Sequence, residues 1–177
     1  MKAPRRTRLL NIRSTPLRVA APALLALAIA QPTLAASCIE LNGAQIPAAA
    51  IMLPTSGATV TAAAAVPGGG AAPQTFGPYC ELDVAIAPVD PSAPTIKMKI
   101  ALPDAWNQKA MMFGGGGYNG TIPNVAGNVP AGPVDQPTPL GRGYAVFGSD
   151  SGHVANPVNP GDFAWNDEAL ANYAMTR

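Results

Sequence analysis

Four consecutive glycines, Gly114–Gly117, are the residues of this chain whose type and spacing best suit chemistry. They follow the apolar run Ala110–Phe113, which we interpret as a buried strand covered on both faces. Glycine costs conformational entropy on folding, so four in a row indicate a backbone that must approach another group very closely. Bare backbone amides at a strand end can bind a phosphate, or they can stabilise the oxyanion of an acyl-transfer reaction.

The sequence that follows the glycines favours the oxyanion. A phosphate-binding P-loop needs a Gly-Lys-Ser/Thr sequence that runs into a helix, but no lysine follows these glycines directly and Pro123 interrupts any immediate helix. In α/β-hydrolases, a glycine-rich turn after a central strand supplies one oxyanion donor, and the residue after the nucleophile supplies another. A flexible loop without chemistry remains the alternative on composition alone.

Alternating apolar residues predict the strands that position this loop. The segments Leu82–Ile86 and Ile96–Leu102 alternate apolar with polar or small residues, which predicts an antiparallel edge hairpin with one face in water. Tyr144–Ser149 is a second buried strand, and it ends in Asp150-Ser151-Gly152-His153. This order predicts the opening of an α/β sheet, in which ligands bind at the carboxyl ends of the strands.

The first residues predict an export signal. Six basic residues precede the apolar stretch Val19–Ala30, and small residues follow as far as Ala35, which is typical of a secretory signal over residues 1–35. The apolar stretch is too short to span a bilayer as a stable helix, so we expect a secreted or periplasmic protein without a membrane span. Removing the signal leaves five basic residues against ten acidic ones, and their scatter gives no electrostatic footprint for nucleic acid.

Residues 36–79 form an Ala-, Gly- and Pro-rich segment. Ser37 and Glu40 have the spacing of a capping box, which predicts a short helix through Leu41. Between Pro54 and Pro78 we predict one short strand, Thr59–Ala62, and loop elsewhere. Cys38 and Cys80 are the two cysteines of the chain. An oxidising compartment favours their pairing, with two free thiols as the alternative. Two cysteines are too few for a structural zinc site.

Five short motifs, taken in order, resemble the tannase and feruloyl esterase family. They are Cys80 before a strand, Leu102-Pro103-x-x-Trp106-Asn107, Phe113-Gly114-Gly115-Gly116-Gly117-x-x-Gly120, Gly141-x-Gly143-Tyr144-Ala145 and Asp150-x-Gly152-His153. The resemblance covers about Cys38–Arg177 and implies a secreted serine hydrolase of the α/β-hydrolase fold. It also implies that the substrate is a small ester of an aromatic acid such as gallate or ferulate. The family includes hydrolases of aromatic polyester monomers.

The resemblance assigns roles to a few residues. Gly115 or its neighbour Gly116 corresponds to the oxyanion donor of the loop, and Cys38 with Cys80 corresponds to an N-terminal disulfide of the family. No cofactor is implied. The lid that holds calcium in some relatives would lie downstream, so we assign no metal site.

The catalytic residues of the family do not occur in this sequence. The family has a Gly-Cys-Ser-x-Gly nucleophile elbow, a later Asp and a C-terminal His, and the fold supplies the three residues in the order Ser, Asp, His. The one histidine of the chain, His153, precedes the place of the nucleophile. We therefore interpret His153, with Asp150, as structural rather than as the base. Ser149 and Ser151 flank Asp150 but show no elbow pattern, so neither is favoured as the nucleophile.

The chain ends inside a predicted helix near Asn172–Arg177, so we expect it to be the first part of a longer protein. Residues 80–177 are then expected to be the start of an α/β-hydrolase domain that lacks the elbow strand, and the 177 residues alone should have no esterase activity. The alternative is a noncatalytic secreted domain that binds a small aromatic or carbohydrate ligand with the same loop. Asn119 begins a glycosylation sequon, which we interpret as coincidental because it lies inside the glycine loop.

Overall fold

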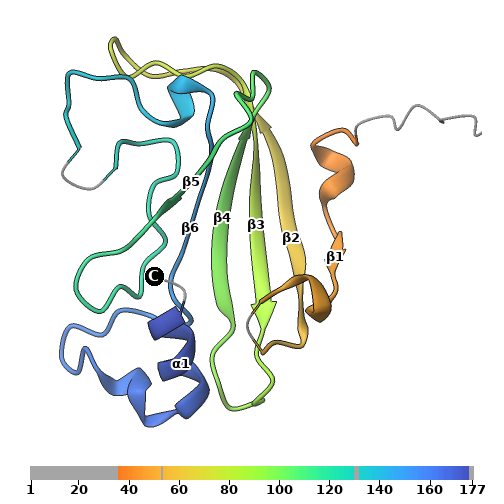
Figure 1. The fold of residues 1–177 in the computed structure, drawn as a ribbon, viewed down its shortest axis with the longest axis vertical. Coiled ribbons are helices and arrows are strands. Elements are labelled where there is room, and N and C mark those ends of the chain that lie inside the picture. Colours follow the sequence, from red (N-terminus) through yellow and green to blue (C-terminus); the bar gives the residue numbers. More distant parts are fainter. Residues whose placement is uncertain (1–35, 53, 130–131, 176–177) are drawn as a thin grey trace, which may run out of the picture. The chain divides into compact units, whose positions relative to one another are not determined.

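A computed structural model describes residues 36–52, 54–129 and 132–175. These residues form a mixed sheet of six strands in the order β1-β2-β3-β4-β6-β5, accompanied by a few short helices (Figure 1). The predicted export signal, residues 1–35, lies outside the described residues. Each helix of the described part falls short of the length and hydrophobicity that a bilayer span requires.

Four antiparallel strands make up one side of the sheet. They are β1 (Gln45–Ile46), β2 (Gly57–Val66), β3 (Tyr79–Ala87) and β4 (Ile96–Pro103). The predicted hairpin is confirmed as β3 and β4, whose register pairs Val84 with Met98. Leu82 and Val84 are buried at alternate positions, as expected for a strand with one face on the core. The hairpin does not lie at the sheet edge, because β2 and β1 continue the sheet beyond β3.

Strand β2 is longer than the sequence predicts. We expected a strand over Thr59–Ala62 and loop beyond it, but β2 continues to Val66 and pairs with β3 as far as Tyr79. Alanine has a low strand propensity, so the run Ala62–Ala65 gives little local signal. The backbone ladder with β3 overrides this weak preference, and a register shift after Val60 accommodates the pairing.

Two parallel strands complete the sheet. β6 (Ala145–Ser149) lies between β4 and β5 (Ala110–Phe113), antiparallel to β4 and parallel to β5. Both predicted apolar strands are confirmed, but the prediction that β5 is covered on both faces is wrong for the described residues. Phe113 is buried, whereas Met112 on the opposite face is 38% exposed. An apolar run indicates burial without indicating which element supplies it, and β5 lies at the edge of this sheet.

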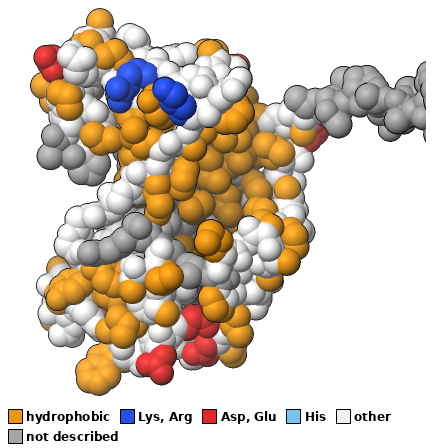
Figure 2. Space-filling model, viewed as in Figure 1, with side chains coloured by type: hydrophobic (Ala, Val, Ile, Leu, Met, Phe, Trp, Pro, Cys, Tyr) orange, Lys and Arg blue, Asp and Glu red, His pale blue; other side chains and the backbone are white. Residues whose placement is uncertain are grey.

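The sheet separates two hydrophobic clusters. One contains Tyr79, Ala101, Phe113, Val125, Leu140 and Val146, and the other contains Ala58, Val60, Cys80, Leu82 and Val84. The clusters lie on opposite faces, because Tyr79 and Cys80 are consecutive strand residues whose side chains alternate. Figure 2 shows hydrophobic side chains gathered over the sheet on the face that is turned to the viewer. Each face of the sheet therefore carries apolar surface that needs cover.

The predicted disulfide is confirmed. Cys38 and Cys80 are bonded, with their Cα atoms 5.5 Å apart. The bond joins the turn that begins the 3₁₀ helix η1 (Ile39–Leu41) to the start of β3. Because Cys80 belongs to the second hydrophobic cluster, the bond attaches the residues before β1 to that face of the sheet.

Short helices accompany the strands. They are the 3₁₀ helices η2 (Ala48–Ala50), η3 (Leu140–Arg142) and η4 (Asp162–Trp165) and the α-helix α1 (Asp167–Met175). The helix predicted near the end of the sequence is confirmed as α1. Glu168 in its first turn accepts hydrogen bonds from the amides of Val89 and Asp90, at 2.8 and 2.5 Å. Its carboxylate therefore clamps α1 to the loop between β3 and β4.

We expect Glu168→Ala to lower the free energy of unfolding by about 1 to 2 kcal/mol, because two hydrogen bonds to a charged group are lost at a partly exposed site. Asp167→Ala is the matched control, because Asp167 also lies in the first turn of α1 and interacts with the helix dipole, but it is exposed. Its loss should cost less than about 0.5 kcal/mol. Urea denaturation of both variants measures the difference, and equal effects would contradict the clamp.

Candidate functional site

The glycine loop leaves the carboxyl end of β5. Strands β5 and β6 run parallel with Phe113 opposite Gly148, so the loop and the segment Asp150–His153 leave the sheet at the same end, where the carboxyl termini of both strands lie (Figure 1). Ligands of α/β sheets bind at the carboxyl ends of the strands. The topology thus brings together the two chemistry-bearing segments that the sequence predicted.

A tight turn shapes the second half of the loop. The Asn119 amide donates a 2.8 Å hydrogen bond to the Gly116 carbonyl, and Gly117 and Asn119 have φ values of 57° and 63°. The Gly117 carbonyl accepts a 3.2 Å hydrogen bond from the Tyr173 hydroxyl. Because Tyr173 belongs to helix α1, this hydrogen bond connects the turn to the helix.

The amides of Gly115 and Gly116 are the available donors of the loop. Both glycines are exposed, and no acceptor for either amide occurs among the described residues. Their N–H groups can therefore meet an external acceptor at the sheet edge, as an oxyanion donor must. The assignment of either amide as that donor stays a prediction.

Asn119 is a residue of this site that the sequence analysis missed. Its Nδ2 atom donates to the Ser149 carbonyl at 3.0 Å and to the Ser151 hydroxyl at 2.7 Å. A Cβ atom on Gly115 would overlap the Asn119 side chain, so this arrangement requires glycine at position 115. The one available signal was the pair of Asn119 and Gly120, since Asn-Gly commonly adopts positive φ in turns.

Asp150 fixes the end of β6 to the start of β4. Its Oδ1 atom accepts hydrogen bonds from the Lys97 amide at 3.0 Å and from the Gly152 amide at 2.9 Å. The side chain is buried, and this burial raises its pKa from the ordinary value of 3.8 while the two amides act in the opposite direction. These contacts are those of a residue that holds strand ends together.

We expect Asp150→Ala to lower the free energy of unfolding by about 2 to 3 kcal/mol, because the buried Gly152 amide and the partly buried hydrogen bond of the Lys97 amide lose their acceptor. Asp150→Asn keeps Oδ1 and retains both hydrogen bonds. The raised pKa favours the neutral carboxyl in the folded protein, so the wild type loses stability as pH rises from 3.8 through the raised value. Asp150→Asn escapes this loss. Urea denaturation from about pH 3 to about pH 7 measures this pH dependence. If the free energy of unfolding of the wild type exceeded that of Asp150→Asn by more at higher pH, the prediction would be contradicted.

His153 packs in an aromatic cluster beside the loop. Its ring is 5% exposed, stacks on Phe163 with the ring centroids 4.0 Å apart, and meets the Tyr173 ring edge-on at 5.9 Å. Neither ring nitrogen has a hydrogen-bond partner among the described residues, so His153 is not paired there with Ser149 or Ser151. The described residues therefore assemble no serine–histidine pair. The interpretation of His153 as structural stays a prediction.

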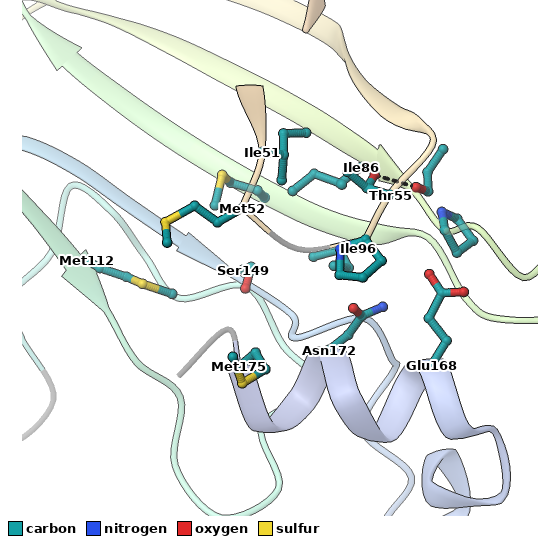
Figure 3. A pocket seen from close by; sticks show the side chains of 14 residues that line it. Ile51, Met52, Thr55, Ile86, Ile96, Met112, Ser149, Glu168, Asn172 and Met175 are labelled. Atoms are coloured by element: carbon teal, nitrogen blue, oxygen red, sulfur yellow. Dashed lines mark hydrogen bonds between the residues drawn. The ribbon is translucent and has the colours of Figure 1, made fainter. Parts of the chain in front are cut away.

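An apolar cavity of about 250 Å³ lies between α1 and the sheet (Figure 3). Met112 of β5 and Met175 of α1 line it, together with Ser149 at the end of β6 and Asn172 on α1. None of Gly114–Gly117 lines this cavity. The loop amides therefore belong to a different part of the surface.

Metal binding has no support in the part of the chain that the structure describes. There, no three His, Cys, Asp or Glu side chains come together in a way that could hold an ion. The loop instead offers backbone amide donors, which suit an anion or a polarised carbonyl oxygen.

Comparisons with known proteins identify relatives that are described as esterases. The family described as tannase and feruloyl esterase matches residues 80–177. An uncharacterized esterase of Agrobacterium fabrum is 46% identical over 147 residues, which cover 82% of this chain and 26% of the relative. Mono(2-hydroxyethyl) terephthalate hydrolase of Piscinibacter sakaiensis is 32% identical over 100 residues, which cover 55% of this chain and 15% of the relative.

Two solved structures from Aspergillus oryzae also resemble the chain. An esterase matches with a TM-score of 0.49 at 25% identity, over 72% of this chain and 25% of its own. Feruloyl esterase B matches with a TM-score of 0.48 at 22% identity, over 72% of this chain and 24% of its own. The chain spans about a quarter or less of the length of each of these relatives. The family match and the 46% identity confirm the resemblance in the motifs: the chain belongs to the tannase and feruloyl esterase family.

Proposed function

We propose that this chain is the N-terminal part of a serine carboxylic-ester hydrolase that acts on small esters of aromatic acids. The observation that carries the proposal is the pair of exposed amides, of Gly115 and Gly116, at the edge where the parallel strands β5 and β6 end. Amides held in place there can donate to an oxyanion without reorganising. Membership of the tannase and feruloyl esterase family supports the ester chemistry.

The proposed reaction proceeds through an acyl-enzyme. A serine outside this chain attacks the ester carbonyl while a histidine takes its proton, and the carbonyl oxygen becomes an oxyanion that the loop amide binds. Collapse of the tetrahedral intermediate expels the alcohol, which takes the proton from the histidine. Water then attacks the acyl-enzyme in the same way and releases the acid. One oxyanion donor of this kind is worth about 3 to 4 kcal/mol in the transition state.

The substrate class and the location of the protein are parts of the same proposal. One relative is named for the hydrolysis of mono(2-hydroxyethyl) terephthalate, and terephthalate is an aromatic acid. The family description names feruloyl esters, whose acid is also aromatic. The Cys38–Cys80 disulfide suits an oxidising compartment, so we propose that the protein is exported to the periplasm or the medium.

A steady-state assay of the protein with all the residues that follow Arg177 in its gene tests the proposal. We expect hydrolysis of methyl gallate or methyl ferulate with a kcat/KM at least about tenfold above that for an aliphatic methyl ester of similar size. With p-nitrophenyl acetate, a burst of one p-nitrophenol per molecule is expected if the acyl-enzyme forms.

The outcomes separate the parts of the proposal. Absence of hydrolysis of every ester would overturn the esterase function. Equal rates on aromatic and aliphatic esters would overturn the substrate class alone. The 177-residue chain by itself should be inactive on all of them, and activity of this chain would contradict the view that the nucleophile lies outside it.

A further inference from the structure

We infer that Asn119 is a positioning residue of this esterase: its side chain ties the glycine loop to the end of β6 and thereby presets the loop amides for the oxyanion. The inference rests on the proposed function. It concerns a residue that contacts no reacting atom in the proposal and acts through the backbone of Gly115 and Gly116.

Two hydrogen bonds carry the inference. The Asn119 Nδ2 atom reaches the Ser149 carbonyl at 3.0 Å and the Ser151 hydroxyl at 2.7 Å. Ser149 and Ser151 are 3% and 2% exposed, so Asn119 anchors the loop to a buried part of the sheet. Asp150, between them, is itself held by the backbone of β4, which makes the anchor rigid.

The fit between Asn119 and Gly115 shows that the loop is shaped around this side chain. A Cβ atom at Gly115 would overlap the Oδ1 and Cγ atoms of Asn119 and would lie 2.8 Å from its Cβ. The Asn119 side chain thus passes directly against the loop backbone at the residue whose amide is proposed to donate. Moving either residue must move the other.

The lack of a hydrogen bond at the Asn119 Oδ1 atom indicates that this side chain does more than fill space in the loop. This atom is buried and has no hydrogen-bond partner among the described residues. A buried acceptor without a donor is unfavourable, and such groups call for an explanation in the function of a site. The geometry explains it: with Nδ2 committed to the end of β6, Oδ1 is left facing the Gly115 backbone.

A double-mutant cycle in the complete enzyme tests the inference. Asn119→Gly frees the loop without strain, because residue 119 has a φ of 63° that suits glycine. We expect its kcat to fall about 10- to 100-fold with KM within about twofold, because a misplaced oxyanion donor affects the transition state alone. Gly115→Ala should lose about 100-fold or more, because the added methyl displaces the loop. Adding Asn119→Gly to Gly115→Ala relieves the overlap and should restore kcat to about the level of Asn119→Gly.

Asn107→Gly is the matched control. Asn107 lies before the other end of β5, and its side chain also makes two hydrogen bonds, from Nδ2 to the Arg142 carbonyl at 2.7 Å and from the Lys109 amide to Oδ1 at 2.9 Å. Its loss should lower Tm as much as Asn119→Gly does while leaving kcat unchanged. Asn119→Asp gives a second test should Asn119→Gly fail to fold, since it fills the same space without the Nδ2 donor; its kcat should also fall with KM unchanged.

The possible results separate a failure of this inference from a failure of the proposed function. A wild-type kcat in Asn119→Gly or Asn119→Asp, an equal kcat loss in Asn107→Gly, or a double variant no more active than Gly115→Ala would overturn the inference. If Gly115→Ala is impaired and Asn119→Gly is not, the inference fails and the proposed function survives. If the wild-type enzyme hydrolyses no ester, both fail.

Discussion

Gly120→Ala is expected to lower the free energy of unfolding by about 4 kcal/mol, the sum of backbone strain and overpacking. Gly120 is buried with a φ of 83°, which a residue with a side chain adopts at a cost. A Cβ atom there would overlap the amide nitrogen of Ala155 and would lie 2.6 Å from its Cα. The Ala155 amide also donates a 2.8 Å hydrogen bond to the Gly120 carbonyl, so the backbones cannot separate without losing that bond.

Gly116→Ala supplies the control within the same loop. A Cβ atom on Gly116 would meet nothing within 4 Å, and its φ lies outside the left-handed region. Its cost in stability should therefore stay below about 1 kcal/mol. Urea denaturation with linear extrapolation gives both values. Similar midpoints for the two variants would show that the Gly120–Ala155 contact is not tight.

Removal of the disulfide is expected to have an effect of similar size. Replacing both Cys38 and Cys80 by alanine should lower the free energy of unfolding by about 4 kcal/mol, because the unfolded chain regains the entropy of a loop that the bond had closed. The two cysteines are separated by 42 residues in sequence, so this loop is long. Cys80 also packs in a hydrophobic cluster, and its sulfur is lost from that cluster in the variant.

Reduction of the wild type is the control for this prediction. A thiol reductant should shift the urea midpoint of the wild type toward that of the double variant and should leave the double variant unchanged, because the sequence contains no other cysteine. A double variant with the midpoint of the oxidised wild type would show that the bond does not contribute to stability.

The parts of the fold that the sequence predicted are those with a local signal. Leu82 and Val84 alternate with polar or small neighbours, and this period alone indicates the hairpin of β3 and β4. Cys38 and Cys80 are the two cysteines of a chain whose first residues predict export, so their pairing could be predicted without knowledge of the fold. The glycine run marked the loop of the candidate site in the same way, because glycine is the residue that a close approach requires.

The parts that escaped prediction depend on contacts between distant segments. The alanines that extend β2 form a strand because β3 pairs with them, and alanine itself carries no such preference. The position of the Asn119 side chain depends on its hydrogen bonds to Ser149 and Ser151, which follow it by some thirty residues. The contact of Gly120 with Ala155 likewise exists only once the strands are assembled.

The strand order has a consequence for how the chain folds as it is synthesised. β5 leaves the ribosome before β6, yet β6 occupies the position between β4 and β5, so among the described strands β5 has no neighbour until Ser149 has emerged. The antiparallel meander from β2 to β4 can form early from contacts close in sequence, whereas the apolar β5 must wait in an unpaired state. During that interval its free backbone is open to pairing with other chains. A holding chaperone that binds Ala110–Phe113 would therefore be of most use between the emergence of these two strands.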